Sequence, residues 1–315
     1  MDNYQTEIHT PDTAESCVNA GKEIKTGKNT ALIFLSFAAL VCGGALAYIR
    51  SLILFGGYDN RICLYPNGAL NTAFNICTAI FGVLLAAFAF IVLRGKEKYT
   101  VKQGGVGLIF SQSLTSLSFA ALAFSVIFIT KKAEASLGTF DSVLVALSLV
   151  SAVAFFASAF ADKETLGVDA GVLLMLFASA CCLFITFYFY FDKTTAIHNT
   201  NKKFATLAFS AALLAIFYGS KAFIKKTNKA VFAALNLLCV CYSTMYAVPN
   251  LIWYFKTSSP LLLNVFFDVV CISLGILSFV TLLSFERTED VQAEGLLQEL
   301  AENINEADTA DGELK

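Results

Sequence analysis

Neutral polar residues inside long apolar runs are the first candidates for chemistry in this chain. Asn71, Asn75 and Thr78 are spaced at i, i+4 and i+7, so a helix presents all three on one face. Because such a face is unfavourable in contact with lipid, we expect it to point towards other helices. The simplest interpretation is hydrogen bonding between helices, with Gln112 as the partner. The alternative is a polar cavity that opens to the outside.

A proline and a further amide extend the cavity interpretation. Pro249 has no amide hydrogen, so the carbonyl group of Met245 loses its usual helical donor and the pattern predicts a kink. Interrupted helices of this kind occur at many transport sites. The residues of the predicted cavity are Asn71, Asn75, Thr78, Gln112, Asn236 and Pro249.

The segment between the first two apolar runs forms a second candidate site. Its glycines, aspartate and proline between positions 56 and 68 predict a folded turn outside the membrane. Loops of this kind often carry binding residues. The predicted contacts with an external ligand are Tyr58, Asp59, Arg61 and Tyr65.

Ionisable residues close to the apolar runs receive structural interpretations. Arg50 and Lys221 lie near the ends of their runs, so we expect both side chains to reach the interface. Three aspartates fall in the first turns of predicted helices, where a carboxylate caps free amide groups: Asp141, Asp169 and Asp268. With no carboxylate expected at mid-span, the pattern argues against a proton- or sodium-coupled carrier built on buried acids.

Motifs for catalysis are missing from the chain. The sequence contains no Walker loop, no His-Glu-x-x-His, no Gly-x-Ser-x-Gly and no dinucleotide fingerprint. Most of the nine cysteines lie in apolar runs, and both histidines lie outside them. We therefore expect no enzyme, no catalytic residues, no cofactor and no metal site.

The elements that must position these residues are membrane spans. Of 315 residues, 57% are hydrophobic and only 15% are charged, which excludes a soluble enzyme and a nucleic-acid-binding domain. A span needs about 20 apolar residues, and without strict alternation such runs predict helices rather than barrel strands. The sequence predicts an all-α transmembrane bundle, integral to the plasma membrane and embedded in its lipid bilayer. Its spans are 31–55, 67–93, 104–130, 141–161, 168–191, 204–220, 230–255 and 261–285.

Lysines and arginines predict the orientation of the bundle. The two densest basic clusters, 94–102 and 221–229, are separated by four spans and so must lie on one side. Short cytoplasmic loops retain such residues. We therefore expect both termini in the cytoplasm.

Polar tails flank the spans. Residues 1–30 are predicted to form a disordered cytoplasmic tail. Residues 286–315 are strongly acidic and contain a short amphipathic pattern over 289–304. This tail either binds a protein partner or the basic inner loops, or is simply solvated.

A weak internal similarity suggests a 4+4 tandem repeat. The segments 94–103 and 221–229 are both basic and follow the second span of a group of four, and the fourth and eighth spans resemble each other at both ends. Apolar helices also resemble one another by composition alone.

Two functional hypotheses follow from these patterns. The first is a permease-like bundle for a small neutral or amphipathic solute, based on the spans, the polar face and Pro249. The second is a non-transporting membrane subunit, sensor or assembly factor that acts through its acidic tail.

Overall fold

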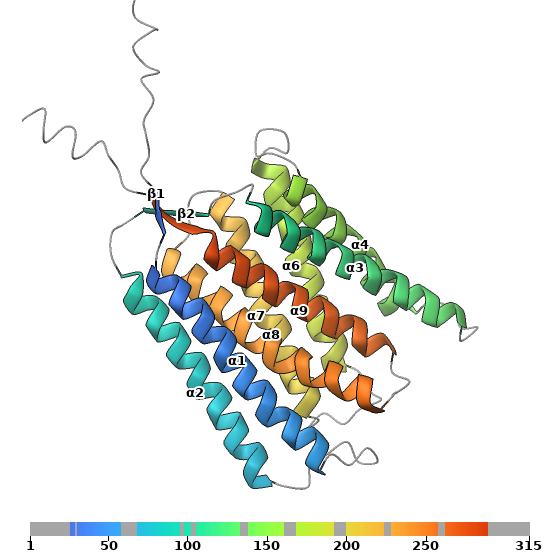
Figure 1. Ribbon diagram of the computed structural model, residues 1–315. Helices are drawn as coiled ribbons and strands as arrows, with labels where there is room; N and C mark the ends of the chain where they lie inside the picture. Colours follow the sequence, from blue (N-terminus) through green and yellow to red (C-terminus); the bar gives the residue numbers. More distant parts are fainter. Residues whose placement is uncertain are drawn as a thin grey trace, which may run out of the picture.

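The protein is a bundle of long helices. The computed structural model describes residues 26–28, 30–57, 68–94, 98–101, 105–132, 138–160, 168–191, 200–223, 228–257 and 262–288. Within these ranges lie eight helices, all long and apolar enough to cross a membrane, which confirms the predicted helical bundle (Figure 1). Their bounds are α1 (Thr30–Gly57), α2 (Gly68–Val92), α3 (Val106–Lys132), α4 (Thr139–Phe160), α6 (Val168–Phe191), α7 (Thr200–Phe223), α8 (Lys229–Thr257) and α9 (Leu262–Leu283).

Hydroxyl groups inside the spans are satisfied mostly by their own helices. Ser36 donates to the carbonyl group of Leu32 at 2.8 Å, and Thr130 donates to that of Val126 at 2.8 Å. In hydrocarbon an unpaired hydroxyl is costly, and the carbonyl four residues earlier is the nearest acceptor. These serines and threonines are therefore compatible with the membrane without forming a polar site.

The most deeply buried helix is α8, which packs against α1, α2, α7 and α9. Small residues allow close contact: a Cβ atom on Gly43 of α1 would lie 2.8 Å from the carbonyl oxygen of Cys241. On α9, a Cβ atom on Gly275 would lie 2.9 Å from that of Ser243. Glycine thus brings the backbones of α1 and α9 close to α8, as is common between membrane helices.

The helix packing does not follow the expected 4+4 repeat. In the second half, α7 packs against α8. The corresponding pair in the first half is separated, because α2 packs against α1 and α8 whereas α3 packs against α4 and α9. Figure 1 shows α1 and α2 on one side of the bundle and α3 and α4 on another. The packing of the helices therefore gives the possible repeat no support.

A three-stranded sheet lies at one end of the bundle (Figure 1). Its strands are β1 (Thr26–Lys28), β2 (Lys98–Val101) and β3 (Phe285–Thr288). The central strand β3 pairs antiparallel with both neighbours: Thr288 lies opposite Thr26 of β1 and opposite Lys98 of β2. The sheet therefore places the segment before α1, the α2–α3 connection and the segment after α9 on the same side of the bundle.

Two of these strands lie at the edges of the predicted tails. Residues 26–28 belong to the tail predicted to be disordered and residues 286–288 to the predicted acidic tail, and the two ranges pair with each other as a backbone ladder. The amphipathic pattern at 289–304 lies outside the described residues. We call the opposite end of the bundle, where α1 ends and α2 begins, the distal end. In the orientation predicted from the basic residues, the sheet faces the cytoplasm and the distal end faces outwards.

Candidate functional site

The residues of the predicted cavity are dispersed. Gln112 lies on α3 and is half-buried, on a helix that packs against α4 and α9 rather than α2. The expected hydrogen bonding between Gln112 and the polar face of α2 is therefore wrong. Sequence periodicity identifies which face of a helix is polar but not which helix lies opposite. Asn236 is buried on α8 and donates to the carbonyl group of Phe232 in its own helix at 2.8 Å.

The three polar residues of α2 differ in their surroundings. Thr78 is buried, donates to the carbonyl group of Phe74 at 2.9 Å and contacts the sulfur of Met245 at 3.6 Å. Asn71 is half-buried, and its buried Oδ1 atom has no hydrogen-bond partner among the described residues. Asn75 is exposed. The predicted external loop, with Tyr58, Asp59, Arg61 and Tyr65, lies outside the described residues.

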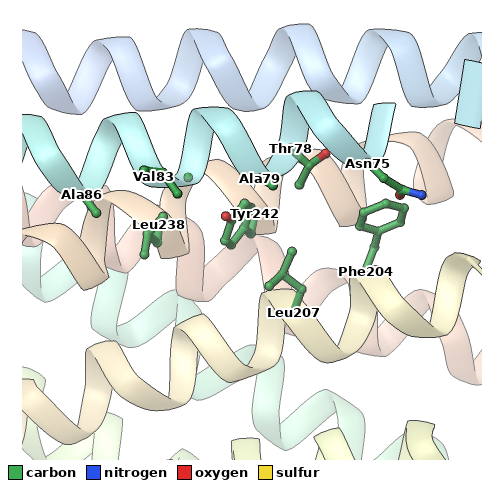
Figure 2. Close-up of a pocket in the computed structure, with 10 residues that line it drawn as sticks. Asn75, Thr78, Ala79, Val83, Ala86, Phe204, Leu207, Leu238 and Tyr242 are labelled. Atoms are coloured by element: carbon green, nitrogen blue, oxygen red, sulfur yellow. The ribbon is translucent and has the colours of Figure 1, made fainter. Parts of the chain in front are cut away.

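A groove of about 490 Å³ runs between α2, α7 and α8, and we call it the α2–α7 groove. Figure 2 shows Asn75 and Phe204 at one end of it and Ala86 and Leu238 towards the other. Residues from α2 and α7 form its walls and residues from α8 its floor: Asn75, Thr78, Ala79, Gly82, Val83, Ala86, Phe204, Leu207, Leu238 and Tyr242. Of the six predicted cavity residues, only Asn75 and Thr78 line it.

The principal polar centre was not predicted, and its core is Arg50. The expectation that Arg50 reaches the interface is wrong, because its side chain is only 1% exposed. Its Nη1 atom donates to the carbonyl groups of Met245 at 3.1 Å and Tyr246 at 2.7 Å, both on α8. The chain folds this way because Pro249, four residues after Met245, supplies no amide hydrogen. Arg50 on α1 thus replaces the missing helical donor.

Two asparagines bind the other side of the guanidinium group. Nη2 of Arg50 donates to the side-chain oxygen of Asn201 on α7 and to that of Asn250 on α8, the latter at 2.9 Å. The nitrogen of the Asn250 amide then donates to Asp268 on α9 at 3.0 Å. Because Asn250 accepts from a cation and donates to a carboxyl group, its orientation is defined by both neighbours. We call these residues, Arg50, Asn201, Asn250 and Asp268, the Arg50 network.

The carboxyl group of Asp268 is also placed differently from the expectation. It is 2% exposed and lies in the second turn of α9, where it accepts from a side chain rather than from the free amides at the helix start. The predicted capping role is therefore wrong for Asp268. Asp141 does lie in the first turn of α4, and the side chain of Asp169 is outside the described part of the structure.

Aromatic rings enclose the Arg50 network. The guanidinium carbon of Arg50 lies 5.4 Å from the ring centroid of Phe204 and 5.3 Å from that of Tyr246, distances typical of cation–π contacts. Phe204 also meets Phe74 of α2 edge to face, with centroids 5.0 Å apart. Phe204 therefore both lines the α2–α7 groove and contacts the buried cation.

The network brings together four helices, α1, α7, α8 and α9. Arg50, Asn250 and Asp268 lie about two turns from the distal ends of their helices, whereas Asn201 lies in the first turn of α7. Arg50 lies seven residues before the end of α1, which a sequence pattern does not distinguish from an arginine at the interface. A usable signal was the combination of Arg50 with Pro249-Asn250 at similar depth, since the first supplies donors and the second a free acceptor.

Fold and site define a multi-pass integral membrane protein with a buried, hydrogen-bonded charge network. No family model, curated protein or solved structure matches the chain. The Arg50 network and the α2–α7 groove are therefore the features from which a function can be inferred.

Proposed function

We propose that the protein is a permease-like carrier for a small neutral or amphipathic solute. The observation that supports this most is the capture of the free carbonyl group of Met245 by Arg50, at the position where Pro249 interrupts the hydrogen-bond ladder of α8. An ionisable residue inside a membrane is costly to bury and usually marks a functional pathway. The part of α8 beyond Pro249 is the element that would move.

The arrangement of bonds supports a moving segment. At Met245 the ladder of α8 is completed by a side chain from α1 rather than by the helix itself. A side chain can exchange partners without unfolding the helix, whereas a backbone bond cannot. Asn250 connects this point to Asp268 on α9, so a change at the carboxyl group would be transmitted to Arg50. In the proposed carrier, the network is the connection between α1, α8 and α9 that would change during transport.

The α2–α7 groove supports the choice of solute. Its lining is mainly apolar, with the amide of Asn75 and the hydroxyl group of Tyr242 as polar groups, a composition that suits small amphipathic ligands. Phe204 lines the groove and also contacts Arg50, so a solute in the groove would touch a ring that is in contact with the network.

Uptake into proteoliposomes tests the proposal. The solutes are a labelled polyol, a zwitterionic amino acid and a single-chain amphiphile, and we expect protein-dependent uptake of at least one. Asn250→Leu, which disconnects Arg50 from Asp268, should reduce this uptake at least tenfold. Asn236→Leu is the matched control, because Asn236 is also buried on α8 but bonds only within its own helix.

Folding is checked by size-exclusion profile and thermal stability in detergent. If Asn250→Leu does not fold, Asp268→Asn serves instead, since it keeps the shape of the side chain. Absence of protein-dependent uptake for all three solutes would contradict the proposal, as would equal uptake by the Asn250 and Asn236 variants.

A further inference from the structure

Charge and polarity vary along the α2–α7 groove. Asn75 lies towards the distal end of α2, followed along the wall by Ala79, Gly82 and Val83. The amide of Asn75 is exposed within a membrane span, where a lipid alkyl chain offers it no hydrogen bond. The remainder of the wall is apolar. One end of an occupant would therefore be polar and the other apolar.

A lysine precedes the groove residues of α7 in the chain, although it is not itself part of the lining. Lys203 is exposed on α7, one residue before Phe204 and one helical turn on the distal side of Leu207. Residues four apart lie on the same helix face, so Lys203 continues the α7 wall beyond Leu207. Its long side chain can extend towards the interface while its stem stays in the apolar layer. An anionic head group would therefore find an ammonium group and an amide at the same end of the groove.

The dimensions favour one alkyl chain. A volume of about 490 Å³ is within the range of pockets for single small ligands. Gly82 allows the hydroxyl group of Tyr242 to lie against α2, since a Cβ atom there would be only 1.9 Å from it. The hydroxyl group and the ring of Tyr242 therefore form the floor at the middle of the groove.

We propose that the α2–α7 groove binds a single-chain anionic amphiphile, such as a long-chain fatty acid, from the distal leaflet. The carboxylate lies at Lys203 and Asn75, and the alkyl chain lies along Ala79 and Val83 against Leu207. This inference rests on the proposed carrier function, for which it names the class of substrate, and binding can be measured without transport.

The binding experiment uses the full chain in phosphatidylcholine nanodiscs at pH 8 with a palmitate that carries a photoreactive group in mid-chain. We expect adducts on groove residues of α2, α7 or α8, and unlabelled palmitate should compete for them better than hexadecanol. Ala79→Trp fills the groove and should abolish the adducts. Ile80→Trp is the matched control, because Ile80 lies at the same depth but is exposed on another face of α2. If Ala79→Trp fails to fold, Val83→Trp replaces it.

The head group is tested separately. Lys203→Gln should weaken competition by palmitate about fivefold, as expected for a partly exposed ion pair, and leave competition by hexadecanol unchanged. Lys131→Gln, at the distal end of α3, is the control that should change neither.

Two alternative occupants have distinct outcomes, and either would overturn the inference. A photoreactive phosphatidylcholine that labels the groove without competition from palmitate would show ordinary bilayer lipid. Disulfide-linked dimers of a Val83→Cys variant that form equally with and without palmitate would show a second copy on this face. Palmitate binding in the groove without protein-dependent uptake of any of the three solutes would contradict the carrier function alone. Uptake of the polyol with no binding in the groove would contradict this inference alone.

Discussion

At the scale of single residues, the central feature of the site is that Arg50 replaces the hydrogen-bond donor that Pro249 lacks. Proline removes one donor from α8, and an arginine from α1 supplies it. The same guanidinium group is then bound by Asn201 and Asn250. A buried charge is tolerated when several groups share it, and costly when any of them is removed. The residues of the network should therefore respond to substitution as a unit.

Arg50→Met should destabilise the protein by about 3 kcal/mol, because it leaves the carbonyl group of Met245 and the side-chain oxygens of Asn201 and Asn250 without their donor from α1. Adding Pro249→Ala should restore about 1 kcal/mol, since alanine again donates to Met245 from within α8. The measurement is the free energy of unfolding in mixed micelles. Arg94→Met, at an exposed arginine, should change it by less than about 0.5 kcal/mol. If Arg50→Met lowers the free energy of unfolding equally with and without Pro249→Ala, Arg50 does not replace the donor that Pro249 lacks.

At the scale of helices, close approach to α8 depends on individual glycines. Gly43 and Gly44 are neighbours on α1, but only Gly43 faces α8: its Cβ position is 2.8 Å from the backbone oxygen of Cys241, whereas that of Gly44 has nothing within 4 Å. Gly43→Ala must push two backbones apart and should cost about 1–3 kcal/mol of unfolding free energy. Gly44→Ala should be neutral or stabilising by up to about 1 kcal/mol, because alanine favours helix.

Each variant adds one methyl group, and the two positions are adjacent. The variants therefore have the same composition, and their comparison isolates the effect of position. Thermal stability in the same detergent is sufficient to rank them. Equal melting temperatures would mean that α1 is not held against α8 at Gly43.

The helices themselves were predictable, because a run of about 20 apolar residues has few alternatives in a chain of this composition. Their partners were not. Of the predicted face of α2, Asn75 and Thr78 line one groove and Asn71 does not, and the other residues of this groove come from α7 and α8 rather than α3. The strands were also missed, since Thr26–Lys28 and Lys98–Val101 are short and polar and pair only through a third segment far away in the chain. Pairing over such distances leaves no local pattern.

At the scale of the whole molecule, the sheet ties together three segments that an even number of spans also places on one side. The pairing of β1 and β3 is specific: Thr26 lies opposite Thr288, and Lys28 lies opposite Glu286. Cysteines introduced by Thr26→Cys and Thr288→Cys should therefore form a disulfide on mild oxidation, since directly opposite positions in a sheet are within bridging distance. Proteolysis between the two positions followed by non-reducing electrophoresis detects the bridge, which keeps the two end fragments together.

The register supplies the control, and the bridge also tests the orientation. Thr26→Cys combined with Glu286→Cys should react much more slowly, because this pair is offset by two residues from the observed ladder.

The excess of lysine and arginine predicts that the sheet is cytoplasmic. An impermeant reductant applied to intact cells should therefore leave the bridge oxidised, and the same reductant should open it once the membrane is permeabilised. A reporter fused after Lys315 should likewise give a cytoplasmic signal. Reduction in intact cells would invert the predicted orientation, whereas equal reaction of both cysteine pairs would contradict the register of the sheet.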